Sequence, residues 1–82
     1  MKIYITSKAQ RELDKISDSI AKNIVTNILK LSDHPFPDNS KKLSGQENYR
    51  LRIGSFRVIY FIDKKKKEIT VLRVADRKTI YR

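Results

Sequence analysis

Arginines stand at alternating positions in the second half of the chain. Arg50 and Arg52 are separated by one apolar residue, and Arg57 follows after a Gly-Ser pair. Arg73 and Arg77 share one parity in a later stretch. A guanidinium group offers a planar fork of N–H donors that matches the oxygens of a phosphate, and it stays charged at any accessible pH. Arginines on one face of a sheet therefore predict a surface that binds phosphate.

The sequence also predicts how these arginines face one another. The Gly-Ser pair at 54–55 suits a two-residue hairpin turn with glycine at the first central position. With that turn, Arg52 faces Arg57 and Arg50 faces Ile59. Like charges directly opposite each other destabilise a sheet by up to about 1 kcal/mol, so the arrangement is expected where an external anion bridges them. The alternative is an ordinary solvated face, which antiparallel sheets often have.

Residues of the opposite parity are apolar and predict the core face of the same sheet. They are Tyr49, Leu51, Ile53, Phe56, Val58 and Tyr60. A third strand is expected from about residue 69 to 75, after a lysine-rich turn at 63–68. We expect Leu72 and Val74 of this strand to join the core, which places Arg73 on the same face as the other arginines.

The first half of the chain supplies one strand and two helices. Residues 2–6 alternate and predict a half-buried strand. Ser7, with Gln10 three residues later, predicts the start of a first helix, and Ser17 offers the N-cap of a second. The second helix carries an apolar stripe of Ile20, Ile24, Val25, Ile28, Leu29 and Leu31. Two prolines in the segment 33–40 end it.

The predicted order is β-α-α-β-β-β, in a single domain over residues 1–82. This order indicates the α+β class, with an antiparallel sheet and both helices packed on one of its faces. The chain of 82 residues is too short for more than one small core.

The charge of the chain is lopsided. There are 19 Lys and Arg against 9 Asp and Glu, a net charge of +10, and residues 41–82 hold thirteen of the basic residues against four acidic ones. Such a field attracts polyanions, and nucleic acid is the first partner to consider. An acidic protein or an anionic membrane surface would be drawn to it as well.

Several classes of protein are excluded by what the sequence lacks. There is no cysteine and only one histidine, so we expect no disulfide, no metal and no cofactor. The longest purely apolar run, residues 58–62, is far shorter than the roughly 20 residues that span a bilayer. The alternating N-terminus does not resemble a signal peptide. We therefore expect a cytoplasmic protein with no role in a membrane.

Three segments of the second half resemble the RelE/ParE superfamily, the toxins of type II toxin–antitoxin pairs. They are Lys41-Lys42-Leu43-Ser44-Gly45, Tyr49-Arg50-Leu51-Arg52-Ile53-Gly54-Ser55-Phe56-Arg57-Val58-Ile59-Tyr60, and Val71-Leu72-Arg73-Val74-Ala75-Asp76-Arg77 through Ile80-Tyr81-Arg82. The preceding strand and helix pair match in order and length, so the resemblance covers essentially the whole chain and implies a RelE-like fold. The segments look closer to the RelE branch, whose members cleave mRNA in the ribosomal A site, than to the ParE branch, whose members poison DNA gyrase.

The resemblance implies an endoribonuclease (an mRNA interferase) in which the ribose 2′-hydroxyl attacks the adjacent phosphate and the 5′-oxygen leaves. Arg57 and Arg77 resemble the arginines that stabilise the transition state and assist the leaving group. Tyr81 resembles the C-terminal tyrosine that orients or activates the 2′-hydroxyl. Arg50 and Arg52 stand where the RelE type has phosphate-binding lysines, and arginine is a poor proton shuttle because its pKa lies above 12.

Two further residues, Arg73 and Lys42, are expected to extend the track that binds RNA phosphates, and Lys41 is a candidate beside Lys42. An ordinary exposed loop is the alternative for Lys41 and Lys42, and a frayed chain end is the alternative for Tyr81. The run Lys64–Lys67 reads as a solvated turn or as a contact to RNA backbone. His34 reads as a residue of a helix C-terminus.

The resemblance also implies partners. We expect a cognate antitoxin that neutralises the toxin, mRNA on the ribosome as the substrate, and operator DNA bound only through the antitoxin complex. Two alternatives remain open at this point. One is a ParE-like inhibitor of DNA gyrase without nuclease activity, and the other is an inactive toxin-fold binding protein.

Overall fold

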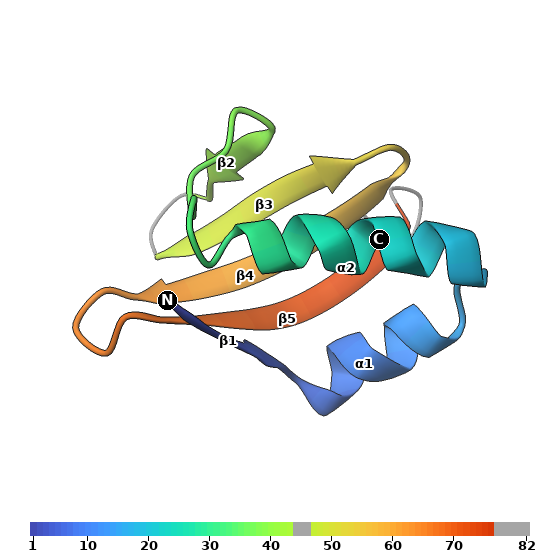
Figure 1. The fold of residues 1–82 in the computed structure, drawn as a ribbon, viewed down its shortest axis with the longest axis horizontal. Coiled ribbons are helices and arrows are strands. Elements are labelled where there is room, and N and C mark those ends of the chain that lie inside the picture. The colour runs from blue at the N-terminus through green and yellow to red at the C-terminus, as the bar shows by residue number, and fades with distance from the viewer. Residues whose placement is uncertain (44–46, 77–82) are drawn as a thin grey trace.

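Two helices pack against a five-stranded sheet in the computed structural model of the protein, which describes residues 1–43 and 47–76 (Figure 1). The elements in chain order are β1 (Lys2–Ile5), α1 (Ser7–Asp14), α2 (Asp18–Lys30), β2 (Ser40–Lys42), β3 (Asn48–Ile53), β4 (Phe56–Asp63) and β5 (Glu68–Asp76). The strand order across the sheet is β1-β5-β4-β3-β2. The predicted α+β class is confirmed.

The sheet is mixed and not antiparallel throughout. β1 runs parallel to β5, whereas β2, β3, β4 and β5 pair antiparallel with their neighbours. The expectation of a wholly antiparallel sheet is therefore wrong in this one pairing. The first strand pairs with the last, so no tight hairpin turn fixes their relative direction. The short strand β2 was also not expected, because it follows directly on the proline-containing loop.

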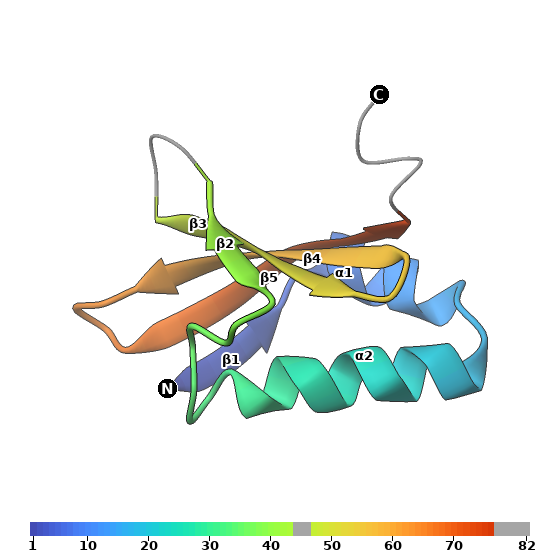
Figure 2. The same ribbon diagram turned by 90° about the horizontal axis from the view of Figure 1, so that it is seen from above.

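The described helices do not cover both faces of the sheet. Figure 2 shows α2 lying across one face and α1 beside β5, with no helix among the described residues over the opposite face. α2 buries Ile24 and Ile28, and α1 buries Ala9 and Leu13 in the same core. Ile20 and Leu29 remain exposed, so the apolar stripe of α2 is narrower than its sequence predicts.

Each helix has a residue with a short hydroxyl side chain at its N-cap position. Thr6, one residue before the predicted start, is the N-cap of α1, and its hydroxyl accepts a hydrogen bond from Ala9 N at 3.1 Å. Ser17 is the N-cap of α2, as predicted. Within residues 1–43 and 47–76, neither helix is long and apolar enough to cross a membrane.

The hairpin between β3 and β4 has the predicted register. Arg52 pairs with Arg57 and Arg50 pairs with Ile59 across the two strands. Gly54 has a φ of 57°, which a side chain would make unfavourable. The turn therefore brings the arginines opposite each other as the sequence indicates.

A bulge changes the parity of β5. Ile59 pairs with Arg73 but Tyr60 pairs with Val71, so Leu72 is the extra residue between them. Val74 is buried as expected, whereas Leu72 is only partly buried and Val71 lies in the core in its place. The prediction for Leu72 is wrong because a regular alternation cannot show a bulge.

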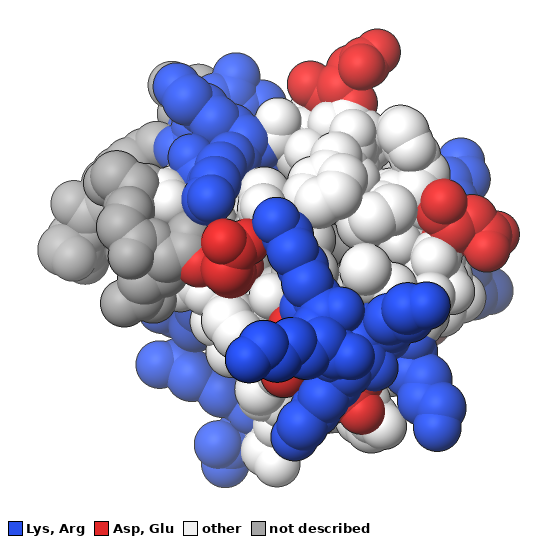
Figure 3. Space-filling model, turned by 90° about the vertical axis from the view of Figure 1, so that its left-hand side faces the viewer, with Lys and Arg blue, Asp and Glu red and all other residues white. Residues whose placement is uncertain are grey.

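The turn between β4 and β5 carries four exposed lysines, Lys64–Lys67. The carboxylate of Asp63 accepts hydrogen bonds from Lys65 N at 3.1 Å and Lys66 N at 3.0 Å, which closes the turn. Figure 3 views this end of the molecule and shows basic side chains gathered there around a few carboxylates. The turn is solvent-exposed, and contact with an RNA backbone remains an untested alternative.

An aromatic cluster fixes the loop that follows α2. The rings of Tyr49 and Tyr60 stack at a centroid distance of 5.6 Å, and Phe36 meets Tyr49 edge-on at 5.2 Å. The buried Tyr60 hydroxyl donates a hydrogen bond to Pro35 O at 2.8 Å, and burial raises the pKa of Tyr60. The loop is therefore held against the core face of β3 and β4.

The substitution Tyr60→Phe tests this anchor. We expect it to lower the free energy of unfolding by about 1 kcal/mol, because the carbonyl of Pro35 loses its buried donor. Urea denaturation followed by circular dichroism measures the change. Tyr4→Phe is the matched control, since the Tyr4 hydroxyl is exposed and its bond to Glu68 spans 3.4 Å. Equal effects of the two substitutions would argue against the anchor.

Candidate phosphate-binding face

The face of the sheet opposite α2 carries two rows of side chains that run across the strands. Lys41 pairs with Arg50, Arg50 with Ile59, and Ile59 with Arg73, which forms the first row. The second row contains Arg52, Arg57 and Ala75. We call this surface the arginine face and define it by Lys41, Arg50, Arg52, Arg57 and Arg73. The predicted gathering of arginines on one side of the sheet is present in the described strands.

A hollow lies at the β2 end of the arginine face. It has a volume of about 370 Å³ and is lined by Asp38, Asn39, Ser40, Lys41, Arg50 and Arg52. Lys41 and Arg52 are exposed and Arg50 is half-buried, so three basic side chains surround one concavity. Such a cluster can bind a phosphate group through charge-assisted hydrogen bonds.

Arg57 is placed differently from its predicted position on an open surface. It lies in the centre of the sheet with only 2% of its surface exposed. A buried guanidinium is desolvated, so its field acts more strongly on a nearby anion than the field of an exposed one.

Arg73 is engaged by a carboxylate of the same chain. Its Nε and Nη2 atoms donate to Glu12 of α1, with an Nη2–Oε2 distance of 2.9 Å. Glu12 also accepts a hydrogen bond from Val74 N at 2.9 Å. Because β1 pairs only with residues 68–71 of β5, this carboxylate satisfies a backbone N–H farther along the strand edge. The structure thus gives Arg73 a role in holding α1 to β5.

The environment of Glu12 lowers its pKa. Burial of the carboxylate raises the pKa, but the hydrogen bonds from Arg73 and Val74 and the charges of Arg73 and Lys8 outweigh it. A carboxylate with a lowered pKa in the folded state stabilises the fold above its unfolded pKa of about 4.3. That contribution is lost as the pH falls through the folded-state pKa.

The substitution Glu12→Gln tests the ion pair. At pH 7 we expect the free energy of unfolding to fall by about 1–2 kcal/mol, a modest value because a third of the Arg73 side chain remains in water. The difference from wild type is expected to shrink as the pH falls below the unfolded pKa of about 4.3 and through the lowered pKa of folded Glu12. Urea titrations at pH 7, 5 and 3 measure it. A difference that does not vary with pH would contradict this role.

Lys42 lies apart from the arginine face. It pairs with the buried Tyr49, so it has the parity of the core face, and its Nζ lies 3.4 Å from the Glu47 carboxylate. Lys64 lies 3.6 Å from the same carboxylate. Burial raises the pKa of Glu47, but the charges of the two lysines outweigh it and the pKa is lowered. Lys41, and not Lys42, is the lysine that the structure brings beside Arg50.

The remaining predicted residues are placed as follows. Arg77 and Tyr81 lie outside the described residues. The backbone N–H of His34 donates to Lys30 O at 3.0 Å, which puts this residue at the C-terminus of α2. Among the described residues, no three His, Cys, Asp or Glu side chains are grouped to hold a metal ion.

Sequence reasoning missed two residues that shape the site, Glu12 and Asn39, and it did not distinguish Lys41 from Lys42. Only the short strand β2 shows which of the two lysines lies beside Arg50. The role of Glu12 could not be predicted, because nothing in the sequence relates this residue to a strand some 60 residues later. Asn39 lines the hollow from a loop, where no periodicity applies.

Several solved toxin–antitoxin structures resemble this fold. The RelBE2 complex from Mycobacterium tuberculosis matches with a TM-score of 0.81 and 27% identity, over 92% of this chain and 95% of that one. The RelE–RelB complex from Pyrococcus horikoshii matches with a TM-score of 0.85 and 25% identity, over 95% and 96%. The intact RelBE complex from Escherichia coli shares the fold with a TM-score of 0.80 and 16% identity, over 92% and 94%. These likenesses define a toxin of the RelE/ParE superfamily.

The family follows from the sequence itself. A family model described as the ParE toxin of type II toxin–antitoxin systems, parDE, matches residues 3–81. The chain therefore belongs to the ParE toxin family of type II toxin–antitoxin systems. No curated protein sequence matches it significantly. The predicted RelE/ParE superfamily and RelE-like fold are confirmed.

Proposed function

We propose that this toxin is an endoribonuclease that cleaves mRNA in the A site of the ribosome. The observation that supports the proposal is the hollow on the arginine face, where the three basic residues Lys41, Arg50 and Arg52 outnumber the one acidic residue of the lining, Asp38. Arg52 also lies directly opposite Arg57 across β3 and β4, so positive charge is concentrated beside the hollow. RNA is a polyanion that supplies a phosphate at every nucleotide.

In the proposed reaction, the ribose 2′-oxygen attacks the adjacent phosphorus and the bond from phosphorus to the 5′-oxygen breaks. One proton leaves the 2′-hydroxyl and one is gained by the departing 5′-oxygen. Arg50 and Arg52 bind and orient the phosphate, and Arg57 stabilises the charge that develops in the transition state. We assign leaving-group assistance to Arg77 and orientation of the 2′-hydroxyl to Tyr81, on the basis of the family resemblance.

The arginines act here through charge and position. An arginine side chain does not release its proton in the accessible pH range, so it cannot serve as the general base. Phe56 of β4 pairs with Asp76 of β5. In the sequence, Phe56 precedes Arg57 and Asp76 precedes Arg77. The end of β5 therefore lies beside the start of β4, which carries the proposed catalytic residue Arg57.

The proposed partner in the cell is a cognate antitoxin. The solved structures of the Mycobacterium tuberculosis and Pyrococcus horikoshii relatives are complexes of a toxin with its antitoxin. A chain with a net charge of +10 suits an antitoxin with an acidic segment that covers the basic surface. Operator DNA would be bound through the antitoxin in the complex, and the toxin would act in the cytoplasm, where messages are translated.

Inhibition of DNA gyrase is the second candidate. The family model that matches the chain is that of ParE. In addition, Arg57 is buried and Arg73 is paired with Glu12, which leaves fewer arginines exposed than a nuclease face was expected to have. A toxin-fold protein without activity is the third possibility.

One experiment separates the three. The toxin is induced in cells without its antitoxin, and a translated message is examined by primer extension while DNA breaks are assayed in parallel. The proposal expects growth arrest with new 5′ ends inside the coding region and intact DNA. DNA breaks with an SOS response and uncut messages would support gyrase inhibition, and normal growth would support an inactive protein.

A further inference from the structure

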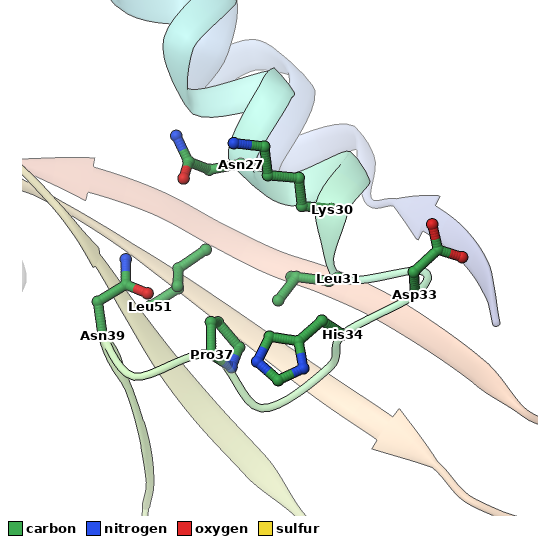
Figure 4. Close-up of a pocket in the computed structure, with 8 residues that line it drawn as sticks. All are labelled: Asn27, Lys30, Leu31, Asp33, His34, Pro37, Asn39 and Leu51. Carbon is green, nitrogen blue, oxygen red and sulfur yellow. The ribbon is translucent and has the colours of Figure 1, made fainter.

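A second cavity lies on the other side of the sheet from the arginine face, at the C-terminal end of α2 (Figure 4). Its volume is about 290 Å³, close to the lower limit of cavities that bind small molecules. It is lined by Asn27, Lys30, Leu31, Asp33, His34, Pro37, Asn39 and Leu51. The lining combines an apolar floor with polar groups around the rim, which suits a planar ring with polar edges.

The floor of the cavity is preformed. Leu31 and Leu51 each have only 1% of their surface exposed and belong to the core. The loop that forms one wall is anchored where Tyr60 donates to Pro35 O at 2.8 Å. A ligand would therefore meet a rigid apolar surface and would not have to order the loop on binding.

Two amide side chains on the rim have a defined orientation. Asn27 Nδ2 donates to Asn23 O at 2.8 Å, and Asn39 Nδ2 donates to Arg52 O at 2.7 Å. Each amide uses its N–H group to donate to a backbone carbonyl. The side-chain oxygen of each amide is therefore available to accept a hydrogen bond from a ligand. Figure 4 shows both side chains beside the cavity. The rim thus presents two neutral hydrogen-bond acceptors to a ligand in the cavity.

The other polar groups of the lining supply negative charge and hydrogen-bond donors. The cavity adjoins the C-terminus of α2, whose carbonyl groups carry partial negative charge, and Asp33 contributes a carboxylate. Lys30 and His34 supply N–H donors on the same rim. The complementary ligand is an aromatic ring with an amino group next to a ring acceptor, which is the edge that adenine and cytosine present.

Asn39 connects this cavity to the proposed substrate. It lines both the cavity and the hollow formed by Lys41, Arg50 and Arg52 on the arginine face. We propose that the cavity binds the base of a nucleotide whose phosphate lies in that hollow, with preference for a base that carries an exocyclic amino group. The identification of the nucleotide as part of an RNA rests on the proposed function, whereas base binding can be measured without cleavage.

The test is a titration of the isolated chain with nucleoside monophosphates, followed by NMR of the backbone amides. AMP and CMP are compared with IMP and UMP, which replace the amino group with an oxo group. We expect shifts at Leu31, His34 and Asn39, and a Kd for the amino-bearing bases roughly 3- to 10-fold lower, the value of one neutral hydrogen bond. Equal Kd values for all four, or shifts confined to Arg50 and Arg52, would overturn the proposal.

The substitution Asn27→Ala gives the matched variant. It removes one amide oxygen from the rim and is expected to abolish the preference for amino-bearing bases. Thr26→Ala is the control, because Thr26 also loses a side-chain hydrogen bond to the helix backbone, to Lys22 O at 2.8 Å, and does not line the cavity. Loss of the preference in both variants, or in neither, would contradict the assignment. A wild-type chain that binds bases but cuts no message would reject the nuclease and leave the base site standing.

Discussion

Arg57→Met is expected to abolish growth arrest and to reduce message cleavage by about 10²–10³-fold, the usual effect of removing one group that stabilises a transition state. Methionine keeps much of the volume of arginine and removes its charge, so the buried position at the centre of the sheet is expected to stay filled. Cleavage is measured on a translated message, and circular dichroism checks the fold. Arg57→Lys is expected to fall between methionine and wild type, because it keeps the charge but loses the guanidinium fork.

The control for this result is Arg11→Met. Arg11 is an exposed residue of α1 and not a member of the arginine face, so the substitution removes the same charge elsewhere on the surface. It should leave both growth arrest and cleavage unchanged. If Arg57→Met is as toxic as wild type and folds normally, Arg57 has no part in the activity.

The double substitution Arg50→Ala and Arg52→Ala is expected to have the second large effect, on RNA binding. We expect the affinity for single-stranded RNA to fall by about 10- to 100-fold, because two charge-assisted contacts to phosphate are lost. The dependence of log K on log salt should become shallower by about 1.4, since each phosphate contact to a single strand contributes about 0.7. Fluorescence anisotropy at several salt concentrations measures both quantities.

A matched pair of charges on α1 gives the control for this prediction. Arg11 and Lys15 are exposed, and replacing both with alanine removes the same charge as the arginine double variant. Its affinity should stay within about 3-fold of wild type at physiological salt, because neither residue lines the hollow and salt screens exposed charges that make no direct contact. If the two double variants lose affinity equally, RNA binding depends on net charge and not on the hollow.

The sheet arrangement of the arginines could be predicted because it depends on local rules. A Gly-Ser pair between two alternating runs determines the turn, and the turn determines that Arg52 faces Arg57. The same alternation places Tyr49, Leu51 and Val58 in the core. These features require knowledge only of residues close in the sequence.

The features that the sequence did not indicate depend on distant parts of the chain. The parallel pairing of β1 with β5 joins the two ends of the described chain, and the Glu12–Arg73 ion pair joins α1 to the same strand. The burial of Arg57 was also not predicted, because alternation along a strand indicates which face a side chain is on and not how exposed it is there. The bulge at Leu72 adds one residue to a ladder whose pattern looks regular in the sequence.

The central claim is that an RNA phosphate occupies the arginine face and is cleaved there by its own 2′-hydroxyl. The most direct measurement uses purified toxin, ribosomes stalled on a defined message with an empty A site, and analysis of the fragment ends. The account predicts a cut in the A-site codon that leaves a 2′,3′-cyclic phosphate on one fragment and a 5′-hydroxyl on the other, and no cut with the Arg57→Met chain. An intact message, or fragments with 5′-phosphate ends, would contradict it.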